Sequence, residues 1–209
     1  MNKIFFLTEP QFQILVWLSY RIAATFALGL PLFLLIWAKI SNSSSIDRLL
    51  SIYWKVSSLY AINLLFLSGD NQLGQFISFI SPILMVCSIW FWVDLNEEID
   101  EMYAFKPISL TTRIWRWTLS FWSILNTALH LFSWRCLSSI SGAFCDTWRE
   151  IPYNSFITTK IIIKFLLGGN WTTGFATFFA YLALILYLIG LVQWLIIQFP
   201  KNGRFAGKF

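Results

Sequence analysis

The sequence predicts an all-α fold: a polytopic membrane helix bundle with about five transmembrane helices and one candidate interfacial helix. The first observation is composition. Of the 209 residues, 57% are hydrophobic, 19% aromatic and only 12% charged, whereas charged residues make up about a quarter of an ordinary soluble domain. The second is length, because five stretches are apolar over the roughly 20 residues that an α-helix needs to cross a bilayer. We therefore expect residues 1–209 to form a single integral membrane domain.

The predicted spans are residues 12–38, 49–68, 74–93, 115–134 and 172–199. Pro31 and Pro82 fall inside the first and third spans, where a kink is tolerated if neighbouring groups satisfy the freed carbonyl. Residues 135–171 form the longest hydrophilic loop. Within this loop, residues 156–167 are typical of a helix that lies in the membrane interface.

Polar residues inside the spans have ordinary explanations. Arg21, Lys55 and Arg116 lie within a turn or two of span ends, which favours side chains that reach the lipid headgroups. Asn63 and Asn126 are expected to form hydrogen bonds between helices, with a polar path through the bundle as the alternative. Tryptophans at span ends predict interfacial belts; they include Trp37, Trp90, Trp92, Trp115, Trp117, Trp134 and Trp171.

The distribution of basic residues predicts the orientation. Nine of the 15 lysines and arginines fall on the side that holds the first and third loops and the C-terminal tail. The positive-inside rule places that side in the cytoplasm or stroma, and loop 135–171 on the opposite side. The net charge of +5 would suggest nucleic acid in a soluble chain. Here the basic residues sit at span ends, so we expect contacts with membrane lipids and no nucleic acid.

The densest polar cluster follows the third span, where residues 94–101 hold half of the ten acidic residues. If the third helix continues out of the membrane, Asp94, Glu97, Glu98 and Glu101 line one face of it. Such spacing suits hard cations, but the Glu-x-x-His pairs of a di-iron site do not occur, and we expect no metal. We favour a face that docks a basic partner, with plain solvation as the alternative. Arg113 and Arg116 are its candidate internal counter-charges.

His130, the sole histidine, is a candidate ligand for chlorophyll or haem, or else a partner in an interhelical hydrogen bond. Pigment-rich proteins present several such ligands, so we expect no cofactor. Cys136 and Cys145 lie in the loop assigned to the non-cytoplasmic side, where a disulfide is permitted, and their pairing stays open. The residues fit no Ser-His-Asp set, phosphate-binding glycine loop or zinc pattern, and we expect no enzymatic activity.

Parts of the chain are similar to a family of cyanobacterial and plastid membrane proteins, loosely labelled as permeases. The strings that carry the resemblance are Leu7–Pro10, Val16–Arg21, Tyr53–Leu59 and Trp90–Asp100, together with the cysteine pair. The resemblance covers most of the chain and brings no catalytic residues. It implies a thylakoid location and, through plastid relatives, biogenesis of the photosystem II inner antenna protein.

These observations predict a non-enzymatic thylakoid membrane protein that assists the assembly or stability of a photosynthetic complex. Its expected partners are membrane lipids and another thylakoid membrane protein or complex. The alternative is a small permease or ion-transporting membrane subunit. The absence of Asp and Glu from the span cores disfavours that alternative, because transport pathways commonly use a buried acid.

Overall fold

A computed structural model describes residues 9–68, 71–103, 106–133 and 172–197. All regular structure in these ranges is helical, and no strand occurs within them. The elements are α1 (Glu9–Ile22), the π-helical stretch η1 (Ala23–Gly29), α2 (Leu30–Ile40), α3 (Ser44–Ser68), α4 (Gln72–Trp90), α5 (Val93–Glu101), α6 (Pro107–Ser133) and α8 (Thr173–Ile197). The predicted all-α class is confirmed for this part of the chain.

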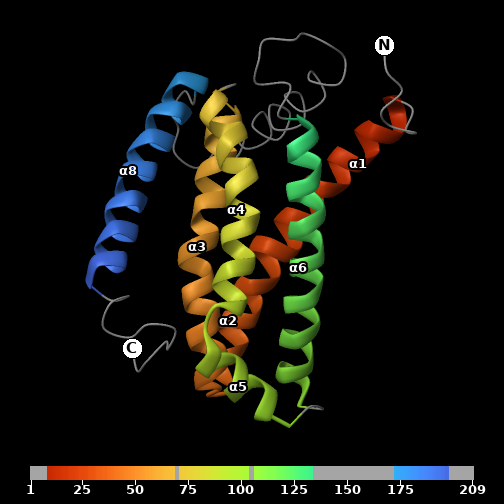
Figure 1. Ribbon diagram of the computed structural model, residues 1–209, viewed down its shortest axis with the longest axis vertical. Coiled ribbons are helices and arrows are strands. Elements are labelled where there is room, and N and C mark those ends of the chain that lie inside the picture. Colours follow the sequence, from red (N-terminus) through yellow and green to blue (C-terminus); the bar gives the residue numbers. More distant parts are fainter. Residues whose placement is uncertain (1–8, 69–70, 104–105, 134–171, 198–209) are drawn as a thin grey trace.

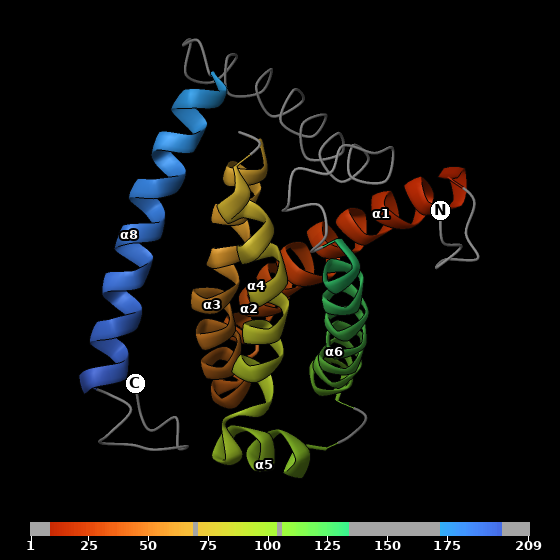
Figure 2. The same ribbon diagram turned by 45° about the horizontal axis from the view of Figure 1, so that its top comes forward.

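The long helices run side by side, and their chain directions alternate along the sequence (Figure 1). Helix α3 packs against α2, α4 and α8, and α4 also packs against α6. Helix α8 lies at one edge of the bundle, and α1 is tilted away from the other long helices (Figure 1). Figure 2 shows α5 lying across the end of the bundle opposite α1. A short polar turn joins α2 to α3, and within it Asn42 has a φ of 50°, in the left-handed region.

Three of the five predicted spans meet the length and composition of a membrane-crossing helix. They are Ser44–Leu67, Leu73–Trp90 and Thr173–Trp194. The other two predicted spans coincide with helices that do not meet both criteria. In the first predicted span, η1 separates α1 from α2, and the apolar helical part, Thr25–Ile40, is shorter than a membrane-crossing helix. Helix α6 begins eight residues before the predicted start, because its first turns bury polar side chains such as Ser109 and Thr112 in the bundle.

The interruption in the first predicted span is explained by Pro31. Proline has no N–H, so it cannot serve the carbonyl of Ala27 in an α-helical turn or that of Phe26 in a π-helical turn. The hydroxyl of Tyr53 donates to the Ala27 carbonyl at 2.7 Å. The indole N–H of Trp115 donates to the Phe26 carbonyl at 2.9 Å. Neighbouring helices therefore satisfy both freed carbonyls, which is the condition under which a kink at Pro31 is tolerated.

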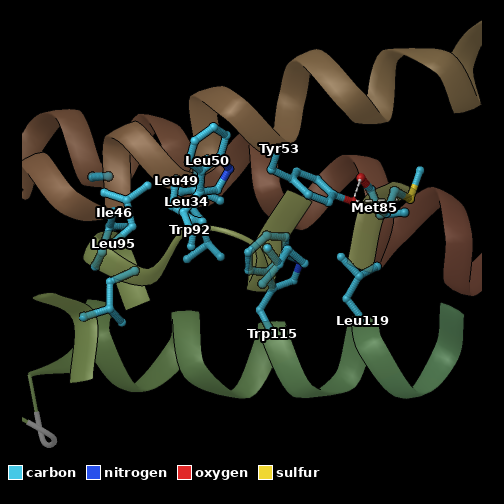
Figure 3. Close-up of a cluster of buried hydrophobic side chains, with 14 of the residues drawn as sticks. Leu34, Ile46, Leu49, Leu50, Tyr53, Met85, Trp92, Leu95, Trp115 and Leu119 are labelled. Carbon is cyan, nitrogen blue, oxygen red and sulfur yellow. Dashed lines mark hydrogen bonds between the residues drawn. The ribbon is translucent and has the colours of Figure 1, made fainter. Parts of the chain in front are cut away.

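The main hydrophobic core lies behind this capped kink, between α2, α3, α4, α5 and α6 (Figure 3). Tyr53 and Trp115 face each other across it, with ring centroids 4.9 Å apart at 90°. This edge-to-face geometry is favourable for aromatic pairs. Trp92 and Trp115 are buried in the core, so the predicted interfacial role is wrong for these two. Trp117 is 68% exposed, and its place in an interfacial belt stays a prediction.

Buried polar side chains join the helices elsewhere. The amide of Asn63 on α3 donates to the hydroxyl of Ser78 on α4 at 2.6 Å. The hydroxyl of Ser19 on α1 donates to the side-chain oxygen of Asn126 on α6 at 2.7 Å. The prediction that these two asparagines form interhelical hydrogen bonds is confirmed.

Candidate functional site at the acidic helix

The acidic segment forms its own helix and does not continue the third predicted span. Helix α4 ends at Trp90, and the chain is extended at Trp92, with φ −85° and ψ 104°, before α5 starts. No glycine or proline marks this break. The buried side chain of Trp92 packs in the main core, and this tertiary contact turns the backbone. The Asn96 amide donates to the Trp90 carbonyl at 3.2 Å and so binds α5 to the end of α4.

Helix α5 is amphipathic. Leu95 and Ile99, one turn apart, are fully buried in the main core. Asp94, Glu97, Glu98 and Glu101 share one face by their helical spacing, as the sequence predicts. Glu97 and Glu101 are exposed, whereas Asp94 and Glu98 are partly buried.

Glu98 forms an internal ion pair. Its Oε2 accepts from the guanidinium of Arg48 on α3 at 2.6 Å and from the hydroxyl of Ser45. The counter-charge of Glu98 is therefore supplied by α3. Arg113 and Arg116, the predicted counter-charges, donate instead to backbone carbonyls and to Asn96. Exposure of the two side chains is 21% for Arg48 and 41% for Glu98. At such exposure, water and salt screen the pair, and its contribution to stability is modest.

Arg113 caps the C-terminal end of α5. Its Nη2 donates to the carbonyls of Ile99 at 2.9 Å, Asp100 at 2.9 Å and Met102 at 3.1 Å. The last carbonyls of a helix have no partner inside the helix, and their partial negative charge attracts a cation. One arginine of α6 thereby fixes the end of α5.

Arg116 was predicted to reach the lipid headgroups, and that prediction is wrong. Its side chain is only 2% exposed and turns into the bundle. Its Nη2 donates to Asn96 Oδ1 at 2.6 Å, and the guanidinium carbon lies 4.3 Å from the ring centroid of Trp90. A buried charge is costly unless it is hydrogen-bonded, and the aromatic face adds a favourable cation–π contact. Arg116 thus holds the first half of α5, as Arg113 holds its end.

The other predicted site residues lie away from α5. His130 is buried near the far end of α6, about 21 Å along the helix axis from Arg116 at 1.5 Å per residue. The structure therefore separates the histidine from the carboxylates. Cys136 and Cys145, loop 135–171 and the candidate interfacial helix lie outside the described residues.

The site joins an anchored inner face to a charged outer face. Within the described residues, no three His, Cys, Asp or Glu side chains are grouped so as to hold a metal ion. The contacts of Arg48 and Arg116 with α5 could not be predicted from local sequence patterns, because they join residues 50 and 20 positions apart. The positive-inside count supplied a partial signal, since it assigned both arginines and α5 to the same side of the membrane.

A bundle with three helices able to span a membrane, exposed apolar faces and an amphipathic helix across one end has the make-up of a helical membrane protein. Residues 13–207 match the family described as "Protein of unknown function (DUF3177)", and the chain belongs to this family. No curated protein matches the chain, and neither does any solved structure.

Proposed function

We propose that the protein is a non-enzymatic membrane protein that assists the assembly or stability of a photosynthetic complex, with α5 as its docking element. The observation that supports docking is the fixed position of α5. Arg113 and Arg116 hold the helix from α6, while Glu97 and Glu101 stay exposed. Carboxylates on an anchored helix bind a partner with less loss of conformational entropy than carboxylates on a mobile loop.

The photosynthetic setting rests on the sequence resemblance alone. It implies a thylakoid location, with biogenesis of the photosystem II inner antenna protein as the specific instance. The partner of α5 would be a basic segment at the membrane surface of a thylakoid protein. Such a contact between exposed charges weakens as salt is raised, because the screening length is about 10 Å at 0.1 M ionic strength.

The proposed topology has five crossings, with the C-terminus on the cytoplasmic or stromal side. The alternating directions of the long helices support it, because α5 and the end of α8 then lie at the same end of the bundle (Figure 1). That end also holds Lys39, Arg48, Lys106 and Arg113, as the positive-inside rule requires. Cysteine labelling at positions 96 and 142 tests this topology, and labelling of both from one side would contradict it.

The docking proposal is tested by affinity purification from photosynthetic membranes in mild detergent. We expect photosystem II subunits to copurify with the wild type, and Glu97→Gln/Glu101→Gln to reduce their recovery. Glu98→Gln is the matched control, because it removes a carboxylate of the same helix that already pairs with Arg48. Unchanged recovery with the double variant would refute docking by this face. Deletion of the gene with unchanged photosystem levels and growth would refute the assembly role.

A small permease or ion-transporting subunit is the second candidate, and one observation favours it. Asn63 Oδ1 and Asn126 Nδ2 are buried without a hydrogen-bond partner among the described residues. Polar atoms of this kind can line a path through a bundle. Solute or ion flux through the purified protein in liposomes, lost in Asn126→Leu, would place this candidate first. Absence of flux in the wild type would remove it.

A further inference from the structure

An apolar crevice of about 680 Å³ opens between α3, α4 and α8. Its volume lies inside the range of roughly 300–1,000 Å³ found for small-molecule sites. Most of its wall is aliphatic or aromatic, and the polar exceptions are Lys55, Ser58, Ser88 and Tyr187. A few polar groups in an apolar wall are typical of a site that binds an amphiphile.

Helix α8 is attached to the bundle on both sides of this crevice. Towards its start, the Asn71 amide donates to the Tyr181 hydroxyl at 2.9 Å. Towards its end, the rings of Trp92 and Trp194 meet edge to face with centroids 5.9 Å apart. Between these two contacts, a Cβ added at Gly190 would meet nothing within 4 Å. The helix is therefore fixed above and below an unfilled space. A helix of another protein, about 10 Å across, could enter this space only by displacing α8, whereas an extended hydrocarbon chain could enter without displacing it.

The polar groups indicate the chemistry of the occupant. Lys55 is exposed and lines the crevice. Helical side chains lean toward the N-terminus of their helix, which for α3 is the end of the bundle where α5 lies. The Cα–Cβ bond of Lys55 therefore tilts toward that end of the bundle, and an extended lysine side chain can reach lipid headgroups there while its stem lies along the apolar wall.

Tyr187 contributes its ring to the wall of the crevice. Its hydroxyl oxygen is buried and has no hydrogen-bond partner among the described residues, so an occupant of the crevice contacts the ring and not the hydroxyl. The polar contact with the occupant therefore depends on Lys55.

We propose that this crevice binds one anionic lipid of the surrounding bilayer. The acyl chain lies between α3, α4 and α8, and the Lys55 ammonium binds the anionic headgroup. The site is distinct from the α5 docking face, and neither depends on the other.

The test is native mass spectrometry of the full-length protein after incubation with equal amounts of phosphatidylglycerol and phosphatidylcholine. We expect one bound phosphatidylglycerol. Lys55→Gln should lower its affinity roughly 10- to 100-fold, the usual effect of a lost hydrogen bond to a charged group. Tyr187→Phe should leave the affinity unchanged, because the hydroxyl that it removes is buried and does not contact the occupant.

Steric filling of the crevice gives a separate test with a matched control. Gly190→Leu places a side chain in the unfilled space and should abolish lipid retention. Gly174→Leu makes the same change on the same helix at a position that is equally open and does not line the crevice, and should bind as the wild type does. Equal retention by these two variants overturns the proposal. Equal binding of the two lipids by the wild type also overturns it. So does a wild-type dimer without bound lipid that becomes a monomer in Gly190→Leu.

Discussion

Tyr53→Phe removes a single hydroxyl and tests whether the bundle depends on capping the kink at Pro31. In the wild type, this hydroxyl donates to the Ala27 carbonyl at 2.7 Å inside the core. Without it, the buried carbonyl loses this donor, and Pro31 has no N–H to replace it. An unsatisfied buried group costs about 1–3 kcal/mol, while side-chain hydrogen bonds between membrane helices average about 0.6 and reach about 1.7 kcal/mol. We therefore expect the free energy of unfolding to fall by about 1–2 kcal/mol.

The measurement is equilibrium unfolding in mixed micelles of mild detergent and dodecyl sulfate, followed by circular dichroism. Tyr60→Phe is the matched control. It makes the same change in the same helix, at a buried tyrosine whose hydroxyl forms no hydrogen bond within the described residues. This control should change the unfolding free energy by less than about 0.5 kcal/mol, the usual limit for substitutions that remove no specific interaction.

A double-mutant cycle with Pro31→Ala separates the carbonyl from other effects of the hydroxyl. Alanine restores an N–H at position 31, which can serve the Ala27 carbonyl directly. In that background, Tyr53→Phe should cost roughly 1 kcal/mol less than in the wild type. Equal costs in the two backgrounds would refute the reasoning, as would equal costs for Tyr53→Phe and Tyr60→Phe.

Three further experiments test the α5 anchor and the packing of the helices. Arg113→Met should lower the free energy of local opening of α5 by about 1.5–3 kcal/mol, because three carbonyls lose a charged donor. Hydrogen exchange of the α5 amides measures this free energy, and unchanged exchange there contradicts the prediction. Arg48→Met and Glu98→Gln should couple by less than about 1 kcal/mol in an unfolding cycle, because the pair is partly exposed; stronger coupling would contradict the assumed screening. Gly74→Ala should lower the free energy of unfolding by about 1–3 kcal/mol, since the new Cβ would lie 3.1 Å from the α3 backbone. Gly174→Ala is the control and should not lower it, because its Cβ would lie in open space. Equal unfolding curves for the two variants would count against close packing at Gly74.

The sequence predicted helices more reliably than it predicted their ends. Hydropathy finds α3, α4 and α8 because their apolar residues form runs long enough to cross a bilayer. It misplaces the start of α6, because this helix buries a polar stripe that includes Thr112 and Arg116 and turns apolar residues such as Ile114 outward. A scale that averages over a window cannot distinguish the buried stripe from a loop.

The candidate site was predicted in part. The spacing of the four carboxylates does place them on one face of a helix, because that inference needs only local periodicity. The break before Val93 has no local signal, since it arises from the burial of Trp92 in a core built by distant segments. The partner of Glu98 depends likewise on how α3 and α5 meet. Tertiary packing decides both features, and contacts between distant segments cannot be predicted from the local patterns of a single sequence.

The peripheral position of α8 also bears on the order in which the protein is made. All buried members of the main core lie between Ala23 and Trp122, and α8 adds only Trp194 at its margin. A chain emerging from the ribosome therefore holds the complete main core before α8 is synthesised. Helices inserted earlier can associate while α8 is still absent, in keeping with membrane helices that insert first and pack afterwards. The last helix then joins a finished surface, and the crevice between α3, α4 and α8 forms only when α8 has joined it.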